Sequence, residues 1–329
     1  MNEDLKITNE WDKTFELSEN VNHKKVTFKN HFGNTIVADM YEPKDCDGKL
    51  PAISVSGPYG AVKEQCSGLY AMKMAERGFL TIAFDPSYTG ESSGNPRYMS
   101  SPDINTEDFQ ASIDYLSTLE NVDSEKISII GICGWGGIAL NAAAIDPRIK
   151  VTIASTMYDM TRVAANGYFD EDDNEEKRFE LRKMLAKQRD EDYKTKKYKL
   201  AGGCLELPVP EDSPFFVKDY SEYYKGRAYH NRSLNSNGGW SIQNNTSWMN
   251  AKFLQYTNEI RNAVMILHGE KAHSYYFGKD AYNNMIKDSK YTNNKVLETI
   301  PNAVHTDLYD NLDVIPFDKI EKFIRDNLK

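Results

Sequence analysis

The chain has 329 residues, of which 27% are charged and 40% hydrophobic, and its formal net charge is −9. This length suits two average domains or one large α/β domain with an insertion. The acidic balance, with no basic cluster interleaved with aromatic residues, argues against nucleic acid or an anionic membrane surface as the partner.

No apolar run approaches the roughly 20 residues that a membrane-spanning helix needs, and the N-terminus has no apolar leader pattern. The four cysteines (Cys46, Cys66, Cys133 and Cys204) show no C-x-x-C spacing. They predict neither a zinc site nor a disulfide framework, and they fit a reducing cytoplasm. We therefore expect a cytoplasmic protein without metal or cofactor that acts on a small molecule, and the sequence leaves open whether the chain self-associates.

The chain begins with a polar arm, residues 1–22, read as a short helix or a flexible lead-in. An antiparallel hairpin follows at residues 24–29 and 34–41, where apolar and polar residues alternate. Buried strands are then expected at 51–57, 79–85, 127–132, 149–155, 263–268 and 295–300. Helices are expected at 65–77, 104–119, directly after residue 133, at 279–287 and at 316–328. Strands that alternate with helices predict βαβ units and a mostly parallel, doubly wound sheet, in which ligands bind beyond the carboxyl ends of the strands.

This alternation stops between residues 160 and 258. A highly charged stretch with balanced signs comes first, and an aromatic, Asn-rich segment follows it. We interpret residues 160–258 as a mainly helical cap inserted into one catalytic domain, which comprises residues 23–159 and 259–329. The charged stretch is expected to form a solvated helix face. The aromatic residues either line a pocket or hold the cap to the body.

The stretch ISIIGICGWGGIALN, residues 127–141, carries the strongest functional signal. A strand that must turn into a helix within three residues strains the backbone at its apex, which explains why glycines flank Cys133 on both sides. The apex side chain then stands at a helix N-terminus, where N–H groups favour a thiolate and a developing oxyanion. This is the nucleophile elbow of the α/β-hydrolases, with cysteine in place of serine. The alternative is a buried cysteine in an ordinary glycine-rich turn.

A cysteine nucleophile needs a base, and His305 lies in the loop between the last strand and the last helix, in the order that this fold uses. The oxyanion hole should combine the N–H of Gly134 with one from the loop after strand 51–57. Tyr59 or Ala61 would supply that second N–H, and the sequence does not choose between them.

The segment GICGWGG resembles the elbow of dienelactone hydrolase and its relatives, which carry cysteine in a G-x-C-x-G-G frame. The resemblance extends to GPYGAVKE, where Glu64 falls on the position of a family glutamate. This resemblance implies that Glu64 is the partner of the resting thiol; otherwise Glu64 is an acid at a helix start. With its cap, the chain is also similar to capped bacterial hydrolases related to X-prolyl peptidases and fungal polyketide transferases.

Two positions depart from the dienelactone hydrolase pattern. The triad acid would stand three residues after Gly269, where this chain has Ala272. Glu270 is the favoured substitute, Asp159 is the other, and a Cys-His dyad without an acid is the third arrangement. No arginine lies in residues 305–309 to bind a substrate carboxylate, so a dienelactone is not the expected substrate.

The residues thus predict an acyl-enzyme on Cys133 with His305 as general base, formed from an ester, lactone or thioester of a small molecule. An acyltransferase on the same scaffold is the second hypothesis. A non-catalytic binding protein is the third, and the absence of an acid at Ala272 favours it.

Overall fold

The computed structural model describes residues 5–46 and 48–328; residues 1–4 of the expected arm, residue 47 and residue 329 lie outside this range. One eight-stranded sheet has the order β1-β2-β4-β3-β5-β6-β7-β8. β1 and β2 pair antiparallel, β2 pairs antiparallel with β4, and the remaining pairs are parallel. The strands are β1 (Val21–Lys29), β2 (Thr35–Pro43), β3 (Leu50–Ser56), β4 (Leu80–Phe84), β5 (Val122–Ile132), β6 (Ile149–Ser155), β7 (Ala263–Gly269) and β8 (Lys295–Ile300).

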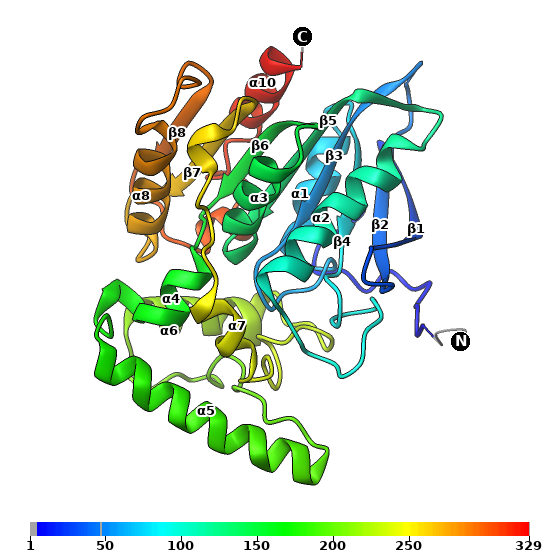
Figure 1. Ribbon diagram of the computed structural model, residues 1–329. Helices are drawn as coiled ribbons and strands as arrows, with labels where there is room; N and C mark the ends of the chain where they lie inside the picture. Colours follow the sequence, from blue (N-terminus) through cyan, green and yellow to red (C-terminus); the bar gives the residue numbers. More distant parts are fainter. Residues whose placement is uncertain (1–4, 47, 329) are drawn as a thin grey trace.

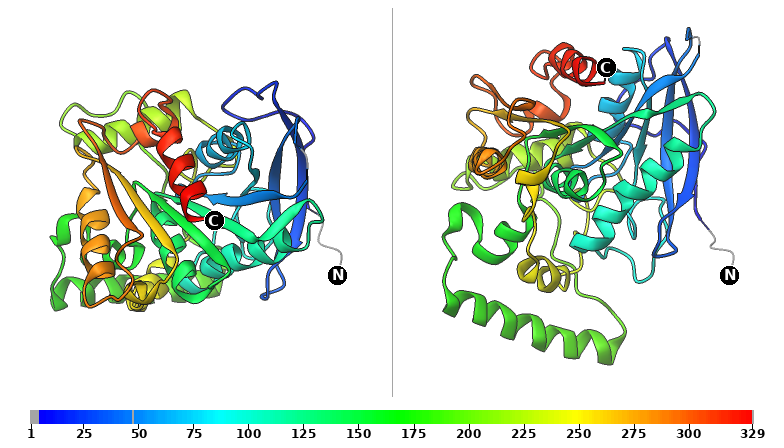
Figure 2. Two further views of the ribbon diagram at one scale, coloured as in Figure 1. Left: turned by 90° about the horizontal axis from the view of Figure 1, so that it is seen from above. Right: turned by 45° about the horizontal axis from the view of Figure 1, so that its top comes forward.

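Helices cover both faces of the sheet, as the view from above shows (Figure 2, left). α1 and α10 pack in one apolar cluster, and α2, α3 and α8 pack in a second cluster on the other face. The predicted mostly parallel, doubly wound sheet is confirmed, and this architecture is the α/β-hydrolase fold. The helices are α1 (Cys66–Ala75), α2 (Pro102–Ser117), α3 (Gly134–Ile145), α4 (Met160–Asn166), α5 (Glu175–Thr195), α6 (Phe215–Ser221), α7 (Asn244–Asn250), α8 (Tyr275–Ile286), α9 (Asp307–Asp310) and α10 (Phe317–Asn327).

From β3 the chain moves outward to β4 and then crosses to β5 on the other side of β3. The strand order therefore reverses between β3 and β5, and the loops after these two strands lie side by side. In open parallel sheets such a reversal is where ligands bind.

The segment between β6 and β7 gathers beyond the carboxyl ends of the strands (Figure 1). It contains α4, α5, α6 and α7, joined by long irregular stretches and one isolated bridge between Leu200 and Ser241. The charged stretch forms α5, in which only Leu185 and Asp192 are buried. The predicted solvated helix face is confirmed.

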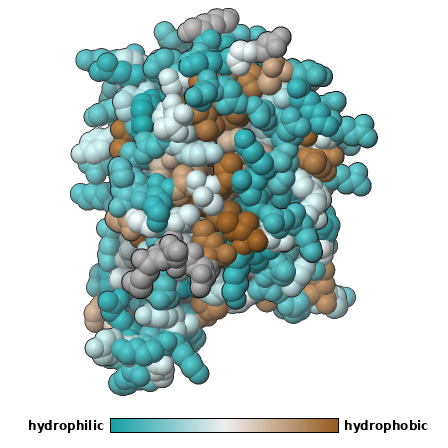
Figure 3. Space-filling model, turned by 90° about the vertical axis from the view of Figure 1, so that its right-hand side faces the viewer, coloured by the Kyte–Doolittle hydropathy of each residue, from teal (hydrophilic) through white to brown (hydrophobic). Residues whose placement is uncertain are grey.

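The N-terminal arm has no helix or strand in residues 5–20, yet it is bound to the body. The side chain of Lys13 is fully buried against Asp39 of β2, and Thr14 donates its N–H to the Glu64 carbonyl. The arm therefore continues along the side of the molecule where β1 forms the edge of the sheet. Hydrophilic residues cover most of this side, with hydrophobic residues in smaller groups between them (Figure 3). Charged edges of this kind limit strand-to-strand association.

Across residues 5–46 and 48–328, no helix has the length and apolar composition of a membrane span.

Candidate active site

Cys133 stands at the apex between β5 and α3 with φ 58° and ψ −127°. This left-handed conformation is strained for a residue with a side chain and persists only where its surroundings enforce it. A Cβ on Gly131 would lie 2.1 Å from the Trp135 carbonyl oxygen, and one on Gly134 would lie 2.7 Å from Cβ of Tyr59. Glycine is thus required on both sides of the cysteine for the strand, turn and helix to pack.

Two backbone N–H groups face the Cys133 sulfur, those of Gly134 and Tyr59. Gly134 begins α3, and Tyr59 lies in the loop after β3, at the reversal of strand order. Of the two loop residues that the sequence allowed, the structure brings Tyr59 to the sulfur. The paired donors have the arrangement that stabilises a tetrahedral oxyanion in acyl transfer.

The cap segment 228–235 holds the loop that carries Tyr59. Asn235 donates from its side chain to the Tyr59 carbonyl (2.8 Å) and from its backbone to the Gly60 carbonyl (3.1 Å). The Ser233 hydroxyl donates to the same Gly60 carbonyl (3.0 Å). The direction of the Tyr59 N–H is therefore set jointly by the sheet and by the cap.

His305 is buried and does not hydrogen-bond a carboxylate. Its Nδ1 lies 2.6 Å from the Ser274 hydroxyl and 2.9 Å from the Thr156 hydroxyl. Its Nε2 lies 3.0 Å from the hydroxyl of Tyr309, which in turn hydrogen-bonds the Cys133 sulfur. The structure thus joins Cys133 to His305 through Tyr309.

Burial governs the protonation of Cys133 and His305. It raises the pKa of the Cys133 thiol, and hydrogen bonds from Tyr309, Gly134 and Tyr59 oppose that rise. It also lowers the pKa of His305 far below its ordinary value, with further lowering from the nearby imidazoles of His273 and His268. At neutral pH both partners are uncharged. The expected effect of the helix N-terminus in favouring a thiolate is therefore outweighed by desolvation.

The expectation for Glu270 was wrong. Its side chain is exposed and accepts the N–H of Asn302, while both nitrogens of His305 are bonded to hydroxyls. Asp159, the other candidate acid, caps the N-terminus of α4 by accepting the N–H groups of Thr161 and Arg162. No carboxylate takes the orienting position in the described part of the chain.

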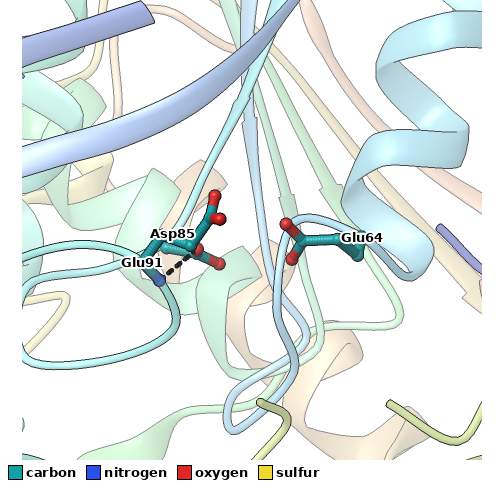
Figure 4. Close-up of side chains that lie close together, drawn as sticks. All are labelled: Glu64, Asp85 and Glu91. Atoms are coloured by element: carbon teal, nitrogen blue, oxygen red, sulfur yellow. Dashed lines mark hydrogen bonds between the residues drawn. The ribbon is translucent and has the colours of Figure 1, made fainter. Parts of the chain in front are cut away.

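Glu64 also lies away from the thiol, and its predicted pairing with Cys133 was wrong. The Nζ of Lys63 lies 2.6 Å from Glu64, 2.8 Å from Asp85 and 2.7 Å from Glu91, and all four side chains are fully buried. Figure 4 shows the Glu64 carboxylate facing those of Asp85 and Glu91. Arg232 from the cap adds a second cation, 2.7 Å from Glu64. Coulombic attraction to these cations lowers the pKa of Glu64 despite its burial.

The same three carboxylates form the one cluster among the described residues whose spacing could hold a metal ion. The Lys63 ammonium already lies between them, and Lys25 and Arg232 add two more cations at Glu91 and Glu64, so the donor set does not need a metal. The Asp85 carboxylate additionally accepts the N–H groups of Lys63 and Glu91 and fixes their loops. Asp85 thus has the structural role that its place after a strand suggests.

A cavity of about 250 Å³ opens beside Cys133. Body and cap both line it, and the aromatic residues of the cap divide between the two expected roles. Tyr220 and Tyr224 line the cavity, whereas Trp240 stacks on the Tyr59 ring (4.5 Å) and holds the cap to the body.

Sequence reasoning missed Tyr309, Ser274 and Thr156. Tyr309 had only one signal, its position four residues after His305 in the segment that carries the imidazole. Ser274 and Thr156 had none, because hydroxyls do not stand out in a search for a triad acid.

Comparison with known proteins gives the family. The profile described as "X-Pro dipeptidyl-peptidase (S15 family)" matches residues 33–284, more than half of the chain. "Uncharacterized protein PA2218" from Pseudomonas aeruginosa is 49% identical over 330 residues, which cover 99% of this chain and 86% of that protein. The crystal structure of PA2218 has a TM-score of 0.93 and 48% identity to this chain, with 99% of this chain and 100% of the other covered.

More distant relatives carry functional names. The "Polyketide transferase claH" of Penicillium crustosum is 28% identical over 134 residues, 40% of this chain and 44% of that protein. The "Thiohydrolase apmlB" of Arthrinium phaeospermum is 30% identical over 131 residues, 40% of this chain and 42% of that protein. The structure of the "Alpha/beta hydrolase GrgF" from Penicillium sp. sh18 has a TM-score of 0.72 at 17% identity, over 93% of this chain and 99% of that one, and supports the fold alone.

Proposed function

Because the chain belongs to the X-Pro dipeptidyl-peptidase (S15) family, on an α/β-hydrolase fold, we propose that it is a hydrolase that forms an acyl-enzyme on Cys133. Its substrate is an ester, lactone or thioester of a small molecule. The likeness of the elbow to dienelactone hydrolase, with cysteine as nucleophile, is part of this proposal. We also propose that the protein is cytoplasmic, which keeps the thiol reduced. The proposal further divides the chain into a catalytic domain (23–159 and 259–329) and a cap (160–258).

One observation supports the proposal above all others. A cysteine in a strained left-handed conformation has two backbone N–H groups aimed at its sulfur and a cavity beside it. A buried structural cysteine needs neither the strain nor the paired donors.

The resting site is neutral, so the thiol proton must move before attack. In the proposed step the Cys133 S–H proton passes to the Tyr309 oxygen as the Tyr309 proton passes to Nε2 of His305. Tyr309 ends the step as it began, and a thiolate faces an imidazolium whose Nδ1–H donates to Ser274 or Thr156. The thiolate then attacks the carbonyl carbon, and the N–H groups of Gly134 and Tyr59 turn to the new oxyanion.

The imidazolium next protonates the leaving alkoxide or thiolate, again through Tyr309, and the acyl-enzyme remains on Cys133. Neutral His305 then removes a proton from water through Tyr309, and the hydroxide attacks the acyl carbon. As the acid leaves, the imidazolium returns that proton to the Cys133 sulfur, which restores the thiol. His305 is unprotonated at neutral pH because burial lowers its pKa, so its Nε2 is free to accept this proton.

The test compares Cys133→Ala with Cys46→Ala, a change at an exposed cysteine. We expect Cys133→Ala to abolish hydrolysis of p-nitrophenyl acetate and Cys46→Ala to leave it within twofold of wild type. Equal activity in all three proteins would remove Cys133 from the mechanism and contradict the proposal.

Acyl transfer to a second small molecule is the alternative. The cap lines the cavity and could keep water from the acyl-enzyme, and one relative bears the name polyketide transferase. Adding alcohol, amine or thiol acceptors during turnover separates the two: acylated acceptor would indicate transfer, and free acid alone would indicate hydrolysis.

A further inference from the structure

The cavity beside Cys133 has an uncharged lining. Its volume, about 250 Å³, is below the roughly 300–1,000 Å³ of sites for drug-sized ligands, so it suits a smaller group. None of the described residues that line it is a lysine, arginine, aspartate or glutamate. The lining consists of Tyr59, Cys133, Tyr158, Met160, Val163, Tyr168, Gly202, Gly203, Cys204, Tyr220, Tyr224, Asn235 and Tyr309.

Two charged side chains close to this lining, Lys225 and Arg162, already have partners. Lys225, whose charge acts on Cys204, forms an ion pair with Glu206. Arg162, between the lining residues Met160 and Val163 in the sequence, is bound to Asp170 and Asp280. A charged group entering the cavity would thus lose its water and find no counter-ion, which is strongly unfavourable.

Aromatic rings form the walls. Tyr158 and Tyr168 meet edge to face with ring centroids 6.2 Å apart, and Tyr220 lies 6.3 Å from Tyr224. Tyr158 comes from the body, whereas Tyr168, Tyr220 and Tyr224 come from the cap, so both parts of the chain present ring surfaces. Rings favour flat partners, which stack or meet them at an edge.

From this lining we infer the substrate class: the acyl group that the site accepts is small, uncharged and aromatic, carried as an ester or thioester. This inference rests on the proposed acyl-enzyme on Cys133. It separates the chain from the activity in its family's name, because a dipeptidyl-peptidase substrate brings a charged N-terminal amino group, for which this cavity offers no carboxylate.

The test uses three matched pairs of substrates, each pair with one leaving group. The p-nitrophenyl esters of phenylacetate and cyclohexylacetate differ only in aromaticity, and those of 4-methylphenylacetate and 4-carboxyphenylacetate differ in charge. Gly-Pro-p-nitroanilide and its N-acetyl form probe the amino group. We expect kcat/KM to be about 2- to 10-fold higher for phenylacetate than for cyclohexylacetate. We expect the 4-carboxy ester to be at least about tenfold slower than the 4-methyl ester, and Gly-Pro-p-nitroanilide to be no better than its acetylated form.

Turnover that is independent of charge, or faster with the cationic or anionic member of a pair, would overturn the substrate class and leave the acyl-enzyme standing. Hydrolysis that survives in Cys133→Ala would instead overturn the proposed function on which the inference rests. The two failures are therefore distinguishable.

A variant pair tests the aromatic wall directly. Tyr168→Leu removes a ring from the cavity lining, whereas Tyr193→Leu removes one that is 76% exposed on α5. We expect Tyr168→Leu alone to bring the phenylacetate to cyclohexylacetate ratio to about one, with an unchanged circular dichroism spectrum as evidence of folding. An unchanged ratio in Tyr168→Leu would contradict the assignment of this wall.

Discussion

Ser274→Asp should supply the carboxylate that the site lacks. The Ser274 hydroxyl lies 2.6 Å from Nδ1 of His305, and both side chains are fully buried or nearly so. A hydroxyl cannot neutralise an imidazolium, and the pKa of His305 accordingly lies far below its ordinary value. A carboxylate at this distance raises the pKa of an imidazole by about 1–3 units.

The magnitude follows from this shift. Two unit charges about 4 Å apart attract by about 4 kcal/mol at an effective dielectric constant of 20. The desolvation free energy of the new buried carboxylate offsets part of this attraction. A net shift of about 2 units corresponds to about 2.7 kcal/mol, or roughly a hundredfold more thiolate–imidazolium pair at pH 7. Because the thiolate is the form that reacts, alkylation of Cys133 should accelerate by a similar factor.

The assay is alkylation by iodoacetamide at pH 7, followed by mass spectrometry of the peptide that contains Cys133. Ser274→Asn is the matched control, because it has nearly the same shape without the charge. We expect a large acceleration in Ser274→Asp and little change in Ser274→Asn, with both variants folded by circular dichroism. Equal rates in the two folded variants would refute the coupling of Nδ1 to the thiol.

Three further predictions follow from the same geometry. Tyr309→Phe should lower kcat/KM for p-nitrophenyl acetate about a hundredfold while the protein stays folded. The reason is that it breaks the only proton path from Cys133 to His305 that the described residues provide. Higher activity would instead mean that Tyr309 blocks the site. Asn235→Ala should lower kcat about tenfold at constant KM by releasing the Tyr59 loop. Asn237→Ala should not, because the Asn237 side chain hydrogen-bonds only to residues of the cap. Lys63→Met should lower the free energy of unfolding in urea at pH 7 by about 3–5 kcal/mol, since it removes the cation that three buried carboxylates share and leaves Asp85 without an ion pair; a loss below about 1 kcal/mol would contradict this.

The pH dependence of Cys133 has a definite sign. Burial raises the pKa of its thiol above the ordinary value, so the thiolate fraction keeps growing from pH 6 to 9. Alkylation measured on the Cys133 peptide should rise across this whole range. A plateau already reached at pH 6 would indicate a preformed thiolate and contradict the neutral resting state.

The elbow could be predicted because its cause is local. Three consecutive segments form it: the strand β5, the strained turn at Cys133 and the helix α3. The glycines that permit their packing can be read directly from the sequence. The place of His305 near Cys133 could be predicted because chain order in this fold is fixed by topology. The donor Gly134 follows from the elbow itself, while Tyr59 required the structure to choose it over Ala61.

The acids were mispredicted because their partners are set by tertiary contacts. Glu64 matches the position of a glutamate in the dienelactone hydrolase pattern, but its carboxylate forms ion pairs with Lys63 and with Arg232 of the cap. Glu270 has the right place after β7, yet its loop turns the side chain to solvent and brings Ser274 to the imidazole instead. The cap was the least predictable part, because its long irregular stretches show no regular spacing of apolar residues from which helices or strands could be predicted.

The most direct test of the account is to trap the acyl-enzyme. Wild-type protein mixed with excess p-nitrophenyl phenylacetate and quenched in acid within a turnover should gain one phenylacetyl group, which peptide mapping assigns to Cys133. Product release without any adduct on Cys133, or an adduct that forms equally on Cys204 in Cys133→Ala, would contradict the central claim.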